Sequence, residues 1–204
     1  MLDFEAHVQK AELMLCNIDP TLKQIIRDGP TFDSTPFMEQ PFEALVHAVI
    51  SQQLSIKSAA AIRQRVLALL PKNDISIHAF NQISLADYKK AGLSEAKTNT
   101  IQGLIHFALD KTNDFNQLHT YPNKQVKERL CQLKGIGPWT VDIFLMFGLK
   151  RLGVFASGDL GLRKAIKSLY ALDELPSPGE CDVIAKRWQL YRSIAAWHLW
   201  RLVD

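Results

Sequence analysis

A turn with two glycines lies between two segments of helical hydrophobic spacing, in the sequence LKGIGPWTV at residues 133–141. Gly135 and Gly137 permit a tight turn whose backbone can approach another surface closely, and Pro138 suits the first turn of the following helix. Backbone N–H groups at such a helix N-terminus point outward and favour the binding of a phosphate. The segment is therefore a candidate anion site, with an ordinary turn between helices as the alternative.

A carboxylate, Asp159, follows the residues FASG at the expected start of another helix. An N-cap is the plain interpretation, since Asp is common at that position. The helix dipole also favours the ionised carboxylate, and a negative charge within a basic segment can stabilise a cation that forms beside it. The residue alone leaves both roles open.

Positive charge is concentrated around these two candidates. The 204 residues carry 24 Lys and Arg against 21 Asp and Glu, and the resulting net charge of +3 is too small to indicate a polyanionic partner. Residues 1–133 are balanced, with 14 charges of each sign, whereas residues 134–170 hold six basic and two acidic side chains. The excess therefore coincides with the glycine turn and Asp159.

The cysteine and hydrophobicity patterns exclude several classes of protein. Cys16, Cys131 and Cys181 are separated by 115 and 50 residues, which fits neither a disulfide framework nor a zinc or iron–sulfur site. A reducing compartment, cytosolic or nuclear, is expected. The N-terminus lacks the features of a signal peptide, and the longest apolar run, residues 143–149, is too short to span a bilayer. We therefore expect a soluble protein.

Helices must position these candidates, because apolar residues recur every three or four positions and alternating strand patterns are absent. We predict an all-α protein. Helices are expected, with ends good to about 2–4 residues, at 3–16, 20–27, 41–50, 55–70, 84–91, 94–110, 123–132, 138–149, 159–170, 180–188 and 190–203. Their starts are marked by caps and prolines at Asp19, Pro20, Pro41, Ser55, Ser84, Ser94 and Pro138.

Two loops and a tryptophan-rich end complete this organisation. Residues 28–41, with three prolines and a glycine, either join two lobes or cross the surface, and residues 171–180 precede the C-terminal helices. Three of the four tryptophans, Trp188, Trp197 and Trp200, lie in the last segment. Core packing is one reading of them, and a role in a site is the other.

Four segments in this order resemble the helix-hairpin-helix DNA glycosylases of the endonuclease III superfamily, the HhH-GPD proteins. They are PFEALVHAVISQQLS, LKGIGPWT, VFASGD and YRSIAAWHLW. The combination is similar to the alkylbase branch, the 3-methyladenine DNA glycosylase II type, from about residue 20 to the end. The resemblance implies one glycosylase unit over residues 1–204, with a lobe at 38–150, a second lobe of 1–37 plus 151–204, and a cleft between them.

The resemblance also implies roles for individual residues. Asp159 would be the catalytic carboxylate, and Gln53 would fill the gap left by the flipped base, with Leu54 as the second candidate. The alternative for the Gln52–Gln53 pair is a solvated helix end. The other implied sites are the base pocket at Trp139, Trp200 and Ile143, the phosphate-binding hairpin at Lys134, Gly135, Ile136 and Gly137, and a structural Na⁺ or K⁺ on the backbone carbonyls of Cys131, Leu133 and Ile136.

The chain departs from the family pattern at several positions. Lys134 replaces the usual Pro, Val141 replaces Ala, and Ile143 stands where some alkylbase enzymes have an aromatic residue, which bears on the breadth of the pocket. Trp139 occupies the position of the lysine of the bifunctional members, so no Schiff base and no lyase step are expected. Neither the four-cysteine cluster nor the β-rich N-terminal domain of some relatives is expected.

The resemblance, with the departures just described, implies a monofunctional glycosylase that releases alkylated purines during base excision repair. A base alkylated at N3 or N7 leaves as a neutral molecule, so one carboxylate suffices without a general acid. The implied partner is double-stranded DNA containing alkylated bases, with no membrane association, and a monomer is expected in the nucleoid of a bacterium or the nucleus of a eukaryote. The alternatives are a glycosylase for deaminated or oxidised bases and a non-catalytic protein that binds damaged DNA.

Overall fold

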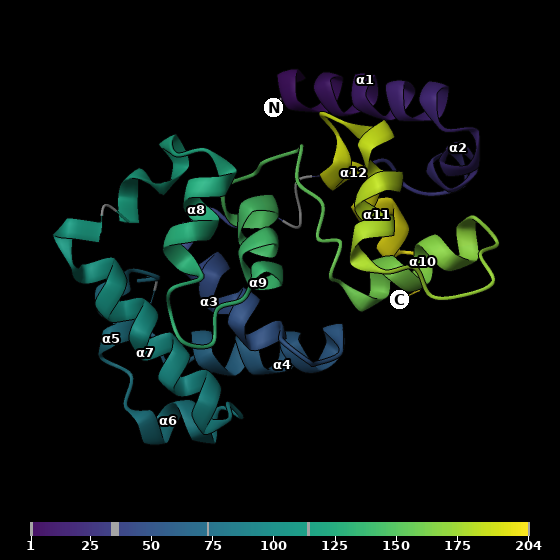
Figure 1. The fold of residues 1–204 in the computed structure, drawn as a ribbon. Coiled ribbons are helices and arrows are strands. Elements are labelled where there is room, and N and C mark those ends of the chain that lie inside the picture. Colours follow the sequence, from purple (N-terminus) through teal and green to yellow (C-terminus); the bar gives the residue numbers. More distant parts are fainter. Residues whose placement is uncertain (1, 34–36, 73, 114, 204) are drawn as a thin grey trace. The chain divides into compact units, whose positions relative to one another are not determined.

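The computed structural model describes residues 2–33, 37–72, 74–113 and 115–203. Helices and turns make up the regular structure of these residues (Figure 1), so the prediction of an all-α protein is confirmed. Among the described helices, none has the length and apolarity that a membrane crossing requires. The chain divides into two compact units: unit 1 comprises Met1–Phe37 with Lys150–Asp204, and unit 2 comprises Met38–Leu149.

Unit 2 is built around one apolar helix, α3. The α-helices of this unit are α3 (Pro41–Ser51), α4 (Ile56–Leu67), α5 (Ile77–Asn81), α6 (Leu85–Lys90), α7 (Glu95–Leu109), α8 (Asn123–Leu130) and α9 (Pro138–Ile143). A π-helical turn, Phe144–Gly148, continues α9, and 3₁₀ turns occupy Lys111–Asn113 and Phe115–Thr120. Helix α3 packs against α4, α7, α9 and the π-helical turn, which explains why its residues are buried nearly all round.

The glycine turn of residues 133–137 belongs to unit 2, whose core is tightly packed, and the Ile136 side chain of the turn is buried in it. Leu45, Val49, Ile101 and Phe144 are completely buried in this unit. Burial of a side chain of that size contributes about 1.5–3 kcal/mol to folding. Figure 1 shows α9 beside α8 and α3, in agreement with the contacts between these helices.

Unit 1 joins the two ends of the chain. Its helices are α1 (Leu2–Ile18), α2 (Pro20–Arg27), α10 (Leu160–Leu169), α11 (Pro178–Ala185) and α12 (Arg192–Trp200), with a 3₁₀ turn at Lys186–Trp188. Helix α12 packs against α10, α2 and α1. The C-terminal helix thus has a helix from the start of the chain and the helix that follows Asp159 as neighbours.

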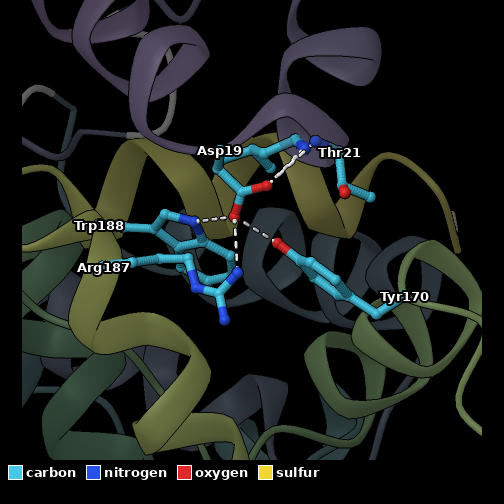
Figure 2. Close-up of polar contacts among 6 residues, drawn as sticks. Asp19, Thr21, Tyr170, Arg187 and Trp188 are labelled. Atoms are coloured by element: carbon cyan, nitrogen blue, oxygen red, sulfur yellow. Dashed lines mark hydrogen bonds and ion pairs between the residues drawn. The ribbon is translucent and has the colours of Figure 1, made fainter.

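A buried carboxylate, Asp19, fastens these segments together (Figure 2). Its Oδ1 caps α2 by accepting the N–H groups of Thr21 and Leu22, each at 3.1 Å. Its Oδ2 accepts the hydroxyl of Tyr170 at 2.6 Å and the indole N–H of Trp188 at 2.9 Å. Although burial alone would raise the pKa of the Asp19 carboxyl, the hydrogen bonds from Tyr170, Leu22 and Trp188 together with the nearby Arg187 charge hold it below its usual value.

Most predicted helices are present, and the predicted starts are confirmed: Asp19, Ser55, Ser84 and Ser94 cap their helices, and Pro41 and Pro138 occupy first turns. The expectation of one helix over 138–149 is wrong, because α9 ends at Ile143 and a π-helical turn follows. Close packing of Gly148 accompanies this change, since a Cβ at that position would lie 2.8 Å from the Ala44 side chain. The short helix α5 was not predicted, and residues 34–36 of the proline-rich loop lie outside the described residues.

Candidate functional site

Asp159 is the N-cap of α10, so the plain interpretation of this residue is correct. Its Oδ1 accepts the backbone N–H of Leu162 at 2.9 Å, and its own N–H donates to the carbonyl of Ala156 at 2.8 Å. The carboxylate therefore sits at the positive end of a helix of 10 residues.

Trp200 lies beside this carboxylate, which the sequence does not reveal. Its indole Nε1–H donates to Asp159 Oδ1 at 2.9 Å, from the last residue of α12. Gly161 makes the approach possible, because a Cβ there would lie 3.0 Å from Asp159 Oδ1 and 3.3 Å from Trp200 Cδ1. Both Asp159 and Trp200 are half-buried, so each keeps part of its side chain at the surface of unit 1.

The segment that leads to Asp159 is fixed by Ser193, which sequence analysis missed. The Ser193 hydroxyl lies 2.7 Å from the carbonyl oxygen of Arg151 and 2.9 Å from that of Val154, and it accepts the N–H of Val154 at 3.3 Å. The backbone N–H of Ser193 donates to the Leu152 carbonyl at 2.8 Å. The buried Ser193, at the start of α12, thus holds residues 151–154 in place ahead of Asp159. No local signal in the sequence indicates this role of Ser193.

The glycine turn in unit 2 has the backbone that its sequence demands. Its hydrogen bond runs from the N–H of Ile136 to the carbonyl of Leu133 at 3.0 Å. Gly135 has a φ of +88°, and a Cβ there would lie 2.0 Å from Thr100 Oγ1, so only glycine fits. Gly137 is the N-cap of α9, and it has no side chain that could accept a hydrogen bond from the first N–H groups of this helix.

The other hairpin residues divide between surface and core. Lys134 is exposed, whereas the Ile136 side chain is only 5% exposed and packs in the core. A ligand can therefore reach Ile136 through its backbone alone. Trp139 and Ile143, four residues apart on α9, lie on one face of that helix and are both half-buried.

The loop between α3 and α4, residues 52–55, carries Gln53 and Leu54, the two candidates for the wedge that fills the gap left by a flipped base. Gln53 has a left-handed backbone with φ +55°, and its side chain is exposed. Leu54 is also exposed, at 39%. We call residues 52–55 the wedge loop.

Gln52 joins the wedge loop to the hairpin, so its half-buried side chain differs from the solvated helix end that the sequence left as the alternative. Its side-chain Nε2 donates to the Gly135 carbonyl at 2.9 Å and to Thr140 Oγ1 at 2.8 Å. From α7, Lys97 donates to the carbonyls of Ile50 and Gln52, both at 2.7 Å. The sequence gives no sign of these contacts, since they join residues at least 45 positions apart.

The basic residues of segment 134–170 have different environments. Lys134, Lys150 and Lys164 are exposed. Arg163 instead donates to the Pro176 carbonyl at 2.7 Å, and Asp142 is buried and paired with Lys127 at 2.6 Å. The exposed Lys134 and Lys164 are therefore open to an anion, whereas the ammonium of Lys150 also lies 6.0 Å from the centroid of the Phe37 ring.

Comparison with known proteins identifies the family of this chain. Residues 46–190 match the HhH-GPD superfamily of base excision DNA repair proteins. The DNA-3-methyladenine glycosylase 1 of Schizosaccharomyces pombe is 29% identical over 198 residues, which cover 94% of this chain and 86% of the relative.

Two solved structures extend the similarity to the fold. The S. pombe 3-methyladenine DNA glycosylase in complex with abasic DNA gives a TM-score of 0.86 at 27% identity, with coverage of 94% of this chain and 95% of that one. A DNA-3-methyladenine glycosidase from Bacillus halodurans gives a TM-score of 0.76 at 31% identity, with coverage of 95% and 89%. The chain is therefore a member of the HhH-GPD superfamily of base excision DNA repair proteins, as its motifs predicted.

Proposed function

We propose that the protein is a monofunctional DNA glycosylase that hydrolyses the N-glycosidic bond of alkylated purines, of the 3-methyladenine and 7-methylguanine type, in duplex DNA. The observation that carries the proposal is the Asp159 carboxylate, held by Trp200 and by the first turn of α10. The extensive match to an S. pombe 3-methyladenine glycosylase supports the substrate class. The whole chain would act as one glycosylase unit and as a monomer, in the nucleoid or the nucleus.

The chemistry needs one negative charge. As the bond between the base nitrogen and C1′ breaks, its electron pair neutralises the cationic base, and positive charge develops on the sugar. A carboxylate about 4 Å from that charge stabilises it by about 4 kcal/mol at an effective dielectric of 20, which is about a thousandfold in rate. Water then adds to C1′ and gives up its proton to Asp159 or to solvent.

The target nucleotide must first leave the helix, because its bond is inaccessible in stacked DNA. Extrusion costs a few kcal/mol and less for a damaged pair. Gln53 and Leu54, both exposed on the wedge loop, are suited to fill the vacated space. The hairpin at Lys134–Gly137 would bind a backbone phosphate through N–H groups, which is independent of sequence and suits a protein that searches for damage.

Aromatic side chains supply the selectivity in this proposal. A cationic base stacked on an indole gains about 0.5–2 kcal/mol. Trp200, next to Asp159, and Trp139, with Ile143 on the same face of α9, are the residues we assign to this contact. Because Trp139 offers no amine, the sugar forms no Schiff base and the strand stays intact.

A structural Na⁺ or K⁺ fits the hairpin as part of the same proposal. Carbonyl oxygens are hard donors that suit such ions. Cys131 is the C-cap of α8, where helix carbonyls lack intrahelical partners, and the Leu133 carbonyl keeps a second lone pair beside the one that accepts Ile136 N–H. With the Ile136 carbonyl they would hold the ion and stiffen the turn that binds phosphate.

The test is release of base from a duplex panel containing 3-methyladenine, 7-methylguanine, ethenoadenine or hypoxanthine. We expect release of the two methylated purines and an abasic strand that breaks only after alkali. A covalent adduct trapped by borohydride would contradict the monofunctional assignment. Release confined to hypoxanthine or an oxidised base would favour the related glycosylase, and tight binding without any release would favour a damage-binding protein.

A further inference from the structure

The wedge loop and the hairpin of unit 2 are joined by side-chain contacts that the proposed function does not by itself require. The Gln52 amide uses both of its N–H donors on the hairpin side, one on the Gly135 carbonyl and one on Thr140 Oγ1. The Gln52 side chain is half-buried, whereas that of its neighbour Gln53 is exposed. We propose that Gln52 is a positioning residue that holds the wedge loop at a fixed place relative to the hairpin.

Helix α7 supports both partners of this contact. Lys97 and Thr100 are three residues apart and share one face of α7. Lys97 donates to the Ile50 and Gln52 carbonyls at the C-terminal end of α3, where a cation also meets the negative end of the helix dipole. Thr100 lies against Gly135 so closely that no side chain fits there. The loop and the hairpin thus rest on one helix and are bridged by Gln52.

The backbone of Gln53 explains why the loop needs such support. A left-handed conformation costs a residue other than glycine about 1–2 kcal/mol, and it persists only where the surroundings enforce it. Gln53 adopts it at φ +55°, directly after the residue whose side chain and carbonyl are both held. We call the hydrogen bonds of Gln52 and Lys97 the clamp. The clamp therefore keeps the exposed Gln53 and Leu54 side chains turned outward.

The link between the wedge loop and the hairpin matters because, in the proposed function, the hairpin binds a phosphate and the wedge loop enters the base stack. The nucleotides fix the distance between these two contacts, so the elements must keep their separation to within about 0.5 Å. Within unit 2, Gln52 is the side chain that we assign to holding this separation, through its hydrogen bonds to Gly135 and Thr140. The assignment rests on the proposed function for its catalytic consequence, but the clamp itself can be measured in the free protein.

The first measurement is amide hydrogen exchange without DNA. In Gln52→Leu, which removes both donors, exchange at the Leu54 N–H is expected to accelerate about tenfold or more, since each lost hydrogen bond contributes about 0.5–1.5 kcal/mol. Thr140→Val removes one acceptor and should give a smaller increase. Gln64→Leu, the same change at an exposed glutamine of α4, should leave this exchange unaltered. Unchanged Leu54 exchange in both Gln52→Leu and Thr140→Val would overturn the proposal.

The second measurement is a double-mutant cycle on single-turnover base release. Gln52→Leu is expected to slow release about tenfold in the native chain but less than twofold in Gln53→Ala/Leu54→Ala, because a positioning residue has nothing left to position there. Equal slowing in both backgrounds would show a merely structural role and refute the coupling. If the native chain releases no base, the proposed function fails, and the exchange measurement still decides whether Gln52 clamps the loop.

Discussion

The indole N–H of Trp200 and the backbone N–H of Leu162 donate to the same oxygen of Asp159, Oδ1, each at 2.9 Å. One carboxylate is thus both the cap of α10 and the partner of a tryptophan from α12. The two donors fix the orientation of the carboxylate plane. Variants of Asp159 and Trp200 can separate this structural role from the chemical role that we propose for Asp159.

Asp159→Asn is expected to remove the chemistry while keeping the fold. Asparagine is as good an N-cap as aspartate, and its amide oxygen can accept both hydrogen bonds, but it carries no charge. Base release from methylated duplex should fall about thousandfold, in line with the estimated charge stabilisation. Single-turnover release and duplex affinity, measured together, check this.

The control for that experiment is the melting temperature of Asp159→Asn, which should stay close to that of the native chain. Normal release by a well-folded Asp159→Asn would remove Asp159 from the mechanism. Loss of duplex binding together with release would instead point to a role in holding DNA.

Trp200→Phe is expected to separate orientation of the carboxylate from stacking on the base. Phenylalanine keeps an aromatic face but cannot donate to Asp159. Loss of one hydrogen bond to a charged group, about 1.5 kcal/mol, predicts a rate of release lowered about tenfold. Release measured with saturating enzyme reports this step without a contribution from DNA binding, and an unaltered rate would show that the Trp200 indole does not orient Asp159.

The two hairpin glycines should respond differently to alanine. Gly135→Ala places a Cβ against Thr100 at a left-handed φ, so the free energy of unfolding should fall by at least about 2 kcal/mol. Gly137→Ala is the matched control, since its φ of −108° is ordinary and a Cβ there meets no atom within 4 Å. Its cost should stay within about 1 kcal/mol. Urea denaturation compares the two, and equal losses would contradict the observed packing of Gly135 on Thr100.

Asp19 is expected to make the stability of unit 1 depend on pH in the acid range. Because the pKa of its carboxyl is lowered in the folded protein, its contribution is complete above the unfolded value of about 3.9 and is lost as the pH falls through the lower folded value. Asp19→Asn should lose about 2–4 kcal/mol at pH 7, because an amide N–H₂ would face the donors of Trp188 and Tyr170.

Urea denaturation at pH 7 and at pH 3 checks the Asp19 prediction, with Tyr170→Phe as the control. That variant removes one donor and should lose about 1 kcal/mol. Asp19→Asn should also show a shallower loss of stability between the two pH values than the native chain. The same acid dependence in Asp19→Asn and the native chain would assign the effect to other carboxylates.

Local signals in the sequence were sufficient for most of the fold. Ser55, Ser84 and Ser94 have short polar side chains placed before apolar periodicity, so their capping role follows from chemistry within three residues. The helix 77–81 was missed because five residues are too few to show a period. The π-helical turn after Ile143 was missed because it accompanies contacts with α3, which lies about a hundred residues earlier in the chain.

The sequence by itself determined the helical class, the helix starts, the glycine turn and the candidacy of Asp159, since each depends on neighbouring residues or on motifs of fixed spacing. Only the tertiary structure decided that Trp200 donates to Asp159, that Ser193 pins the segment before it, and that Gln52 bridges the wedge loop to the hairpin. Those contacts join residues 39 to 83 positions apart. A hydrogen bond over such a separation depends on how helices pack, and packing is a property of the whole chain that no local pattern records.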